Sequence, residues 1–427
     1  MSEGFRSPGL DEWFVGAGFG LFVHWDHASQ QGLETSWPLT GGVEVLPVSW
    51  WDQPTENYHA SAATFNPTAW DPVAFAQRAK AAGATYVVFT TKHHSGYVMW
   101  ETETTDWSVT KASPYGKDIV GPLADALRAV GLRVGFYFSL SDWHEETYPP
   151  FTDEHKPYVL GSTPPLPSEE DAEKYRAYMR AQLTEILTKY GQIDELWFDG
   201  GWERPVKWWE PKKVEALVRE LQPNIVINER LYSVGDFETP EQFVPAKPLE
   251  GPWETCMTMN DGWGWVPTDT NYKSATTIIH TLCEIVGKGG NFLLNVSPMG
   301  DGALPAPQVE RLDAVTRWMA THREAVVGVK PGLEPWQFYG PSTRRDSTIY
   351  AISLGRPYES ITIRGVPVKR LRSATVLGSG TELDVRRHTA IMESFMPDPN
   401  GEITAYIPEA EIDEFATVVA FDFEGDL

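Results

Sequence analysis

Residues 168–201 read SEEDAEKYRAYMRAQLTEILTKYGQIDELWFDGG and contain one complete helix–strand unit. Ser168 and the acidic residues after it form a helix N-cap and first turn, and Gly191 ends the helix. The apolar run LWF then stops at Asp199, which two glycines follow. A continuous apolar run of this kind is typical of a strand that is buried on both faces, as in a parallel sheet flanked by helices.

The same alternation recurs on both sides of this unit. Strands are predicted at GFGLFVHW (18–25), TYVVFTTKHH (85–94), LRVGFYFSL (132–140), IDELWFDG (193–200), NIVINER (224–230), PWETCM (252–257) and NFLLNVSP (291–298). Helix-like segments separate them at 74–83, 118–131, 168–191, 211–222 and near 273–287, and 305–323 closes the series. Seven or eight such units predict a (β/α)8-like barrel. A doubly wound sheet is the alternative, but no GxGxxG or P-loop follows the first strand.

The character of the chain changes after Pro331. Short, partly alternating, β-branched segments follow, with turn residues between them, at 347–354, 360–367, 373–378, 403–410 and 417–424. They predict a small antiparallel β-sandwich. We therefore expect a catalytic barrel domain over residues 1–330 and a β-sandwich domain over residues 331–427.

The composition and net charge disfavour several classes of binding partner and site. The 427 residues include 35 basic and 59 acidic side chains, a net charge of −24, which disfavours nucleic acid and anionic membrane surfaces as partners. Cys256 and Cys283 are too few for a disulfide framework or a zinc site, so we expect buried thiols. No signal peptide or membrane span is visible, which favours a cytoplasmic protein; a homo-oligomer is left open. The 18 Trp, 19 Phe and 16 Tyr fill a large core or line a site for flat ligand faces such as those of sugars.

The catalytic site of a barrel lies where its strands end. Asp199 follows an apolar strand and precedes two glycines, which suits a nucleophile or a metal ligand; a helix N-cap is the alternative. Glu254 follows Trp253 in an apolar segment, where burial raises the pKa of a carboxyl group as a general acid requires. The alternative for Glu254 is an ion pair with Arg230. Two carboxyl groups on one barrel face indicate glycoside hydrolysis.

Because histidines follow several predicted strands, a metal-dependent hydrolase is an alternative to a glycoside hydrolase. His24, His93, His94 and Asp199 include types that ligate zinc. However, adjacent His93 and His94 should point to opposite sides of a strand, and no HxH ends the first strand. We therefore expect no metal and no cofactor, and histidines that hydrogen-bond to sugar hydroxyl groups.

Seven segments together resemble the α-L-fucosidases of glycoside hydrolase family 29: GFGLFVHW, TTKHHSGYVMW with TDWSV, GFYFSLSDW, ELWFDGGWERP, VINER, WETCMTMNDGWGW and GGNFLLNVSPMGDG. The resemblance implies a retaining exo-α-L-fucosidase that acts on terminal fucose of oligosaccharides or glycoconjugates. It implies Asp199 as the nucleophile and Glu254 as the acid/base, with Glu241, Glu238 and Glu229 in reserve. It places the fucose pocket at His24, His93, His94, Tyr137, Trp197 and Arg230. It places Trp263 near the C6 methyl group, with Trp265 as the alternative. Trp25, at the end of the first predicted strand, is also predicted to bind the substrate.

The sequence departs from the family pattern at three places. Asp26 stands where many members have glycine, and Ser95 stands where aspartate is common. The nearest counterpart of the family's Glu-Trp-Tyr segment is Ser49-Trp50-Trp51, so the family's glutamate contact to fucose is not expected here. A carbohydrate-binding protein without activity is the remaining rival, and the presence of both Asp199 and Glu254 argues against it.

Overall fold

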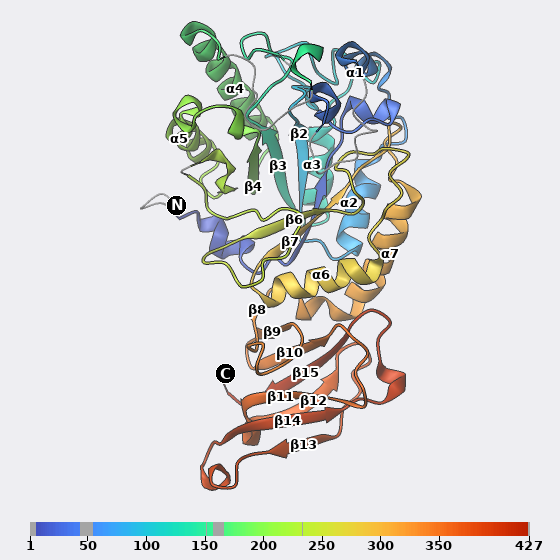
Figure 1. The fold of residues 1–427 in the computed structure, drawn as a ribbon, viewed down its shortest axis with the longest axis vertical. Helices are drawn as coiled ribbons and strands as arrows, with labels where there is room; N and C mark the ends of the chain where they lie inside the picture. The colour runs from blue at the N-terminus through green and yellow to red at the C-terminus, as the bar shows by residue number, and fades with distance from the viewer. Residues whose placement is uncertain (1–5, 43–53, 151, 157–165, 233, 426–427) are drawn as a thin grey trace.

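The computed structural model describes residues 6–42, 54–150, 152–156, 166–232 and 234–425. Its first part is built on a parallel sheet with the strand order β5-β4-β3-β2-β1-β7-β6 (Figure 1). The strands are β1 (Phe19–Val23), β2 (Tyr86–Lys92), β3 (Arg133–Ser139), β4 (Glu195–Asp199), β5 (Val226–Ile227), β6 (Glu254–Thr258) and β7 (Asn291–Val296). This is the predicted (β/α)8-like architecture, with seven strands in the described part of the chain.

The gap between β5 and β6 is closed by single bridges. The segment 237–241 makes isolated parallel bridges to Asn228 on one side and to Trp253 and Cys256 on the other. The strand predicted at 224–230 is much shorter. Beyond Ile227 the side-chain amide of Asn228, in place of the backbone, pairs with Phe198: it accepts from the Phe198 N–H and donates to the Phe198 carbonyl, at 2.8 and 2.9 Å. The segment after β5 is therefore free to curve across the barrel.

Helices surround the sheet: α1 (Thr55–Ala60), α2 (Pro72–Ala81), α3 (Val120–Ala129), α4 (Glu169–Lys189), α5 (Pro211–Leu221), α6 (Ala275–Gly287) and α7 (Ala306–His322). Ser168 caps α4 as predicted, since its hydroxyl accepts from the Asp171 N–H at 3.1 Å. Among the described helices, none is both long and apolar enough to cross a bilayer.

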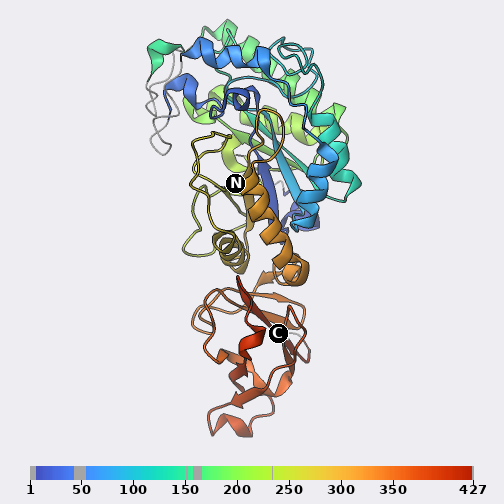
Figure 2. The same ribbon diagram turned by 90° about the vertical axis from the view of Figure 1, so that its right-hand side faces the viewer.

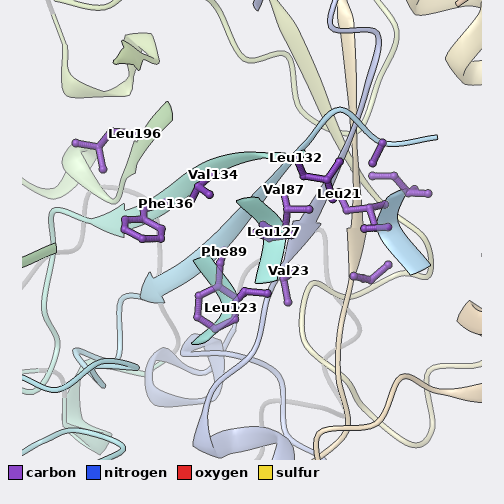
Figure 3. Packing of buried hydrophobic residues seen from close by; sticks show 14 of the residues in the cluster. Leu21, Val23, Val87, Phe89, Leu123, Leu127, Leu132, Val134, Phe136 and Leu196 are labelled. Carbon is purple, nitrogen blue, oxygen red and sulfur yellow. The ribbon is translucent and has the colours of Figure 1, made fainter. Parts of the chain in front are cut away.

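Alternate residues of each strand face two different cores. Outward residues pack under the helices, as Figure 3 shows for Val87 and Phe89 of β2 beside Leu123 and Leu127 of α3. Inward residues fill the barrel with a second cluster: Leu10, Phe14, Ala17, Phe22, Tyr86, Val88, Tyr137, Trp197, Val226, Phe237, Cys256 and Leu293. Along β4 the period of two places Trp197 on the inner face, with Asp199 at the end of the same face.

The C-terminal part consists of two antiparallel sheets, ordered β12-β15-β10-β9-β8 and β11-β14-β13. Its strands are β8 (Lys330–Pro331), β9 (Ser342–Arg345), β10 (Thr348–Ser353), β11 (Ser360–Pro367), β12 (Leu371–Val376), β13 (Val385–His388), β14 (Asn400–Tyr406) and β15 (Thr417–Phe423). Figures 1 and 2 place these sheets beyond α6 and α7, and Trp318 of α7 donates to the Ala416 carbonyl at 3.1 Å. The predicted boundary at residues 330 and 331 falls within β8, and we keep 1–330 and 331–427 as proposed domains.

Candidate active site

A cavity of about 180 Å³ opens at the carboxyl ends of the barrel strands. It is lined by Phe22, His24, Trp37, His93, His94, Tyr137, Trp197, Asp199, Trp202, Arg230, Glu241 and Trp263. Seven of the predicted substrate-binding residues and the predicted nucleophile therefore meet in one place. The cavity is smaller than the roughly 300–1,000 Å³ of pockets for drug-sized ligands, which suits a single sugar ring.

Asp199 lines the cavity and accepts two hydrogen bonds there. The Tyr137 hydroxyl donates to its Oδ2 at 2.9 Å, and Arg230 Nη1 donates to its Oδ1 at 3.0 Å. Burial would raise the pKa of this carboxyl group, but the Arg230 charge and the two hydrogen bonds outweigh burial and hold the pKa below its usual value. Asp199 is therefore ionised near neutral pH, as a nucleophile must be.

Arg230 joins Asp199 to a second carboxylate. Its Nη1 bonds Asp199, and its Nη2 donates to Glu241 Oε2 at 2.7 Å. Its Nε donates to Thr239 Oγ1 at 3.0 Å, and the guanidinium carbon lies 4.5 Å from the Trp197 ring centroid. One rigid guanidinium thus fixes both carboxylates relative to the aromatic floor of the cavity.

Glu241 comes from the bridging segment between β5 and β6. Its side chain is 38% exposed, against 12% for Asp199. The next residue, Gln242, has a φ of +62°, and its amide oxygen accepts from the Thr258 N–H at 3.2 Å. A non-glycine residue in this region is strained unless its surroundings hold it. The contact with β6 therefore fixes the turn that presents Glu241 to the cavity.

Three buried histidines line the wall. His24 Nδ1 lies 2.7 Å from Asn295 Oδ1, and His94 Nδ1 lies 2.7 Å from Ser139 Oγ. Burial lowers the pKa of His24 to about 3 and that of His94 to about 4, so both are neutral near pH 7. An amide oxygen can only accept, so His24 Nδ1 carries the proton and its Nε2 is an acceptor.

The expectation that His93 and His94 point to opposite sides is not met. Both rings line the cavity, with their centroids 4.2 Å apart. Strand alternation does not apply to them, because β2 ends at Lys92. Among the described residues, no group of three or more His, Cys, Asp or Glu side chains is arranged to hold a metal ion.

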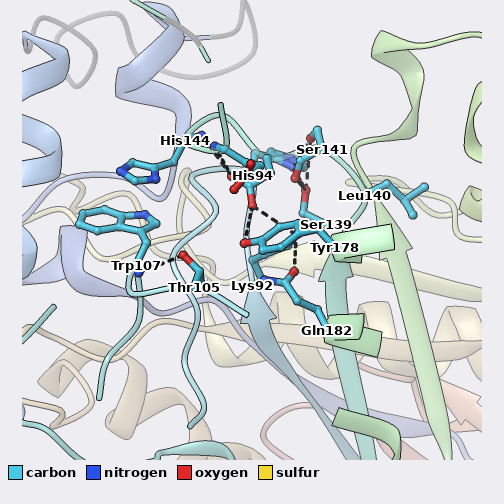
Figure 4. Close-up of polar contacts among 12 residues, drawn as sticks. Lys92, His94, Thr105, Trp107, Ser139, Leu140, Ser141, His144, Tyr178 and Gln182 are labelled. Atoms are coloured by element: carbon cyan, nitrogen blue, oxygen red, sulfur yellow. Dashed lines mark hydrogen bonds and ion pairs between the residues drawn. The ribbon is translucent and has the colours of Figure 1, made fainter. Parts of the chain in front are cut away.

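Buried Lys92 anchors the loop that carries these histidines. Its Nζ donates to Gln182 Oε1 of α4 at 3.0 Å and lies 3.5 Å from Asp142 Oδ2 (Figure 4). The backbone N–H of Trp143, next to Asp142, donates to the His94 carbonyl at 2.7 Å. Burial lowers the pKa of Lys92, although the Asp142 charge opposes this effect. The loops after β2 and β3 are thus tied together behind the cavity.

Aromatic rings form the rest of the cavity wall. Trp263 lies 4.7 Å from His24 between ring centroids, and its backbone N–H donates to buried Glu34 Oε2 at 2.9 Å. Trp37 and Trp202 were not predicted; their rings are nearly parallel at 8°, with centroids 6.4 Å apart. Both follow strand ends, Trp37 in the loop after β1 and Trp202 three residues after Asp199, and this position was the signal that could have identified them.

Two of the departures from the family pattern contact each other. The Ser95 hydroxyl donates to Asp26 Oδ2 at 3.4 Å, and Asp26 also accepts from the Ala28 N–H at 2.8 Å. Neither residue lines the cavity, and their contacts connect the loops after β1 and β2. Ser49-Trp50-Trp51 lies outside the described residues.

Glu254 and Trp25 are not brought to the cavity. Glu254 is the first residue of β6 and is fully buried, whereas Asp199 is the last residue of β4. These are opposite ends of a parallel barrel, and a five-residue strand spans about 13 Å. Trp25 packs against Phe65 and Trp70 at 5.5 and 4.9 Å between centroids. The predicted site roles of Glu254 and Trp25 therefore do not fit their positions.

Two of the alternative acid/base candidates, Glu229 and Glu238, also lie outside the cavity that contains Asp199. Glu229 and Glu238 line a separate hollow with Val234, Gly235, Phe237, Glu250 and Pro252. The Glu229 carboxylate accepts from both the backbone N–H and the hydroxyl of Thr239, at 3.0 and 2.9 Å. Of the three reserves, only Glu241 shares the cavity with Asp199.

The chain is similar to known α-L-fucosidases in sequence and structure. A family model described as alpha-L-fucosidase matches residues 3–324. The tissue alpha-L-fucosidase of Bos taurus is 31% identical over 411 residues, which cover 88% of this chain and 81% of that protein. The structure of alpha-L-fucosidase isoenzyme 1 from Paenibacillus thiaminolyticus has a TM-score of 0.83 and 32% identity, covering 98% of this chain and 99% of the other.

A second solved structure is an α-L-fucosidase of glycoside hydrolase family 29 from Bacteroides thetaiotaomicron. It is a trapped covalent intermediate in complex with 2-fluoro-fucosyl fluoride, obtained with a glutamate-to-glutamine variant. Its TM-score is 0.83 at 25% identity, and the match covers 100% of this chain and 98% of the other.

Proposed function

This chain belongs to the α-L-fucosidase family, glycoside hydrolase family 29, and we propose that Asp199 is its nucleophile and Glu241 its acid/base. Members of this family are glycosidases that act on fucosylated substrates. The covalent intermediate trapped in the Bacteroides relative supports retention of configuration through two displacements.

One observation carries the assignment: the two terminal nitrogens of Arg230 hold Asp199 and Glu241, at 3.0 and 2.7 Å. Two carboxylates bridged by one guanidinium are compatible with the separation of about 5–5.5 Å that retaining glycosidases need. Asp199 is buried and ionised, whereas Glu241 is exposed enough to meet water and a leaving group. Asp199 can therefore act from inside the cavity, and Glu241 can reach both water and the departing oxygen.

In the first step, a carboxylate oxygen of Asp199 attacks the anomeric carbon of fucose. The bond from that carbon to the glycosidic oxygen breaks, and Glu241 gives its proton to the departing oxygen. A fucosyl ester of Asp199 results. Tyr137 and Arg230 keep the Asp199 oxygens aimed at the carbon until the bond forms.

In the second step, Glu241 acts as a base. It takes a proton from water, the water oxygen attacks the anomeric carbon, and the bond to Asp199 breaks. Asp199 returns as a carboxylate and Glu241 is protonated again. Two inversions at the same carbon give fucose with its original configuration.

The cavity is lined by both polar and apolar side chains, which suits a 6-deoxy sugar. Buried His94 Nε2 has no hydrogen-bond partner in the described structure and lies 3.7 Å from Asp199 Oδ2. Since burial keeps His94 neutral, a sugar hydroxyl that donates to Nε2 would satisfy this nitrogen. Trp263, beside His24 in the cavity lining, offers an apolar face to the C6 methyl group. A cavity sized for one ring supports exo action on terminal fucose.

The test compares two leaving groups on aryl α-L-fucosides. For Glu241→Gln, kcat/KM should fall about 10³-fold on a phenyl fucoside but less than about tenfold on a 2,4-dinitrophenyl fucoside, since general acids contribute roughly 10²–10⁴-fold. Azide should restore turnover of the activated substrate. The matched control is Glu238→Gln, an exposed glutamate of the same segment, which should leave both rates unchanged. Equal losses on both substrates would remove Glu241 from the acid/base role.

A further inference from the structure

Glu254 is a buried carboxyl group that has no role in the proposed mechanism. Its Oε1 accepts from Trp197 Nε1 at 3.1 Å, and its Oε2 accepts from the Tyr86 hydroxyl. The residue has no exposed surface. Both oxygens are thus occupied inside the barrel, and neither reaches the cavity.

Trp197, the partner of Glu254, supports the groups that hold the catalytic carboxylates. Its ring is stacked with that of Tyr137, at 22° and 5.6 Å between centroids. The guanidinium of Arg230 lies over the same ring, at 4.5 Å. Tyr137 and Arg230 in turn donate to Asp199, and Arg230 also donates to Glu241. Any rotation of the indole would therefore displace both donors.

The orientation of the indole depends on its single N–H. A tryptophan side chain has a broad second torsion, so its surroundings set the angle of the ring. The N–H is buried, and a buried donor without an acceptor is strongly disfavoured. Glu254 Oε1 supplies that acceptor at the end of the ring that points away from the cavity.

We propose that Glu254 is a positioning residue that acts through Trp197: it fixes the indole, and the indole fixes Tyr137 and Arg230 around the two catalytic carboxylates. This proposal rests on the proposed roles of Asp199 and Glu241. It assigns no proton transfer to Glu254, and it explains why a glutamate stands inside the barrel.

The surroundings of Glu254 favour the neutral acid. Burial raises its pKa to about 8, and burial together with the Glu254 charge raises the pKa of Glu195, which opens β4 on the same inner face. A neutral carboxylic acid and a carboxamide have the same shape. In a glutamine at position 254, the amide oxygen can accept from Trp197 and the amide nitrogen can donate to the Tyr86 hydroxyl.

The experiment compares Glu254→Gln with Glu254→Met, which fills similar volume but offers the indole no comparable acceptor. We expect Glu254→Met to lower kcat/KM about 30-fold, by the same factor for phenyl and 2,4-dinitrophenyl fucosides and mainly through kcat, because such a loss reports transition-state geometry. Glu254→Gln should recover most of this loss. Azide should restore neither variant.

Tyr86→Phe is the matched control, because it removes the other hydrogen bond of the same carboxyl group and leaves the indole bond intact. It should cost less than about threefold, well below the loss for Glu254→Met. In a Trp197→Phe background, where no N–H remains, Glu254→Met should add little. If Glu254→Met does not fold, Trp197→Phe replaces it, with the same expected equal loss on both substrates.

Three results would overturn the proposal. They are a Glu254→Gln variant as slow as Glu254→Met, a Tyr86→Phe variant equally slow, or additive losses in the double variant. A loss confined to the phenyl fucoside, with azide rescue, would make Glu254 the acid/base and overturn the Glu241 assignment as well. Failure of the Glu241 test alone, with the Glu254 results as expected, would limit the proposal to the positioning of Asp199, to which Tyr137 and Arg230 both donate.

Discussion

Replacing Arg230 by methionine should move the acid limb of the kcat/KM profile to higher pH. Asp199 must be ionised to attack, so activity is present above its pKa and is lost as the pH falls through that value. Arg230 holds this pKa down against the effect of burial. Without the guanidinium, burial is less opposed, the pKa of Asp199 rises, and the loss of activity begins at higher pH.

The expected shift of the acid limb can be worked out from the contact between Arg230 and Asp199. Arg230 Nη1 lies 3.0 Å from Asp199 Oδ1, and the two side chains are 22% and 12% exposed, so solvent screens the pair only in part. A hydrogen bond to a charged group contributes about 1.5–3 kcal/mol, and about 1.4 kcal/mol corresponds to one pKa unit. The acid limb should therefore move up by about 1–2 pH units. The rate near neutral pH should also fall about 10²-fold, as when one preorganised donor is removed.

The assay is kcat/KM for a 2,4-dinitrophenyl α-L-fucoside from pH 3 to pH 8. Arg219→Met is the matched control, because Arg219 pairs with buried Asp236 at 2.8 Å outside the cavity. That variant should be less stable but should keep the wild-type acid limb. An unmoved limb in Arg230→Met, or an equal shift in Arg219→Met, would refute the electrostatic role of Arg230.

Three further predictions test other parts of the site. Trp263→Ala should lower the preference for an aryl α-L-fucoside over the α-L-galactoside, which carries a hydroxyl on C6, roughly tenfold; an unchanged ratio of kcat/KM values would separate Trp263 from the methyl group. Trp25→Ala should lower the thermal unfolding midpoint, since emptying an aromatic core site costs about 3–5 kcal/mol, and a large rise in KM would contradict its packing role. Incubation with EDTA should leave hydrolysis unchanged, and a loss that zinc restores would contradict metal-free chemistry.

The position of Asp199 at the cavity could be predicted from the sequence for two reasons. It ends a continuous apolar strand, and in a parallel barrel such ends meet at one rim. His24, Tyr137 and Trp197 were found by the same reasoning together with the family resemblance. The barrel itself follows from the buried strands, and the antiparallel sheets follow from short alternating segments after Pro331.

The positions of Glu241 and Glu254 could not be predicted from the pattern of apolar residues. Glu254 was expected at the same rim as Asp199, on the strand predicted at 252–257. However, β6 runs from Glu254 to Thr258, so Glu254 lies at the opposite end of its strand from that rim. Glu241 lies on a segment joined to its neighbours by single bridges, which has no strand-like apolar run. Its position depends on the curve after Asn228 and on the strained turn at Gln242, and neither is visible in residue periodicity. Cellular location and oligomeric state stay predictions.

The most direct test of the account is to identify the residue that carries the covalent intermediate. Wild type and Glu241→Gln would be incubated with 2-fluoro-fucosyl fluoride, digested and analysed by mass spectrometry. We expect a 2-fluorofucosyl ester on Asp199 in both enzymes, formed as fluoride leaves, and slower loss of the label in Glu241→Gln. A label on Glu241, Glu254 or another carboxylate, or no label on an enzyme that turns over fucosides, would contradict the proposed nucleophile.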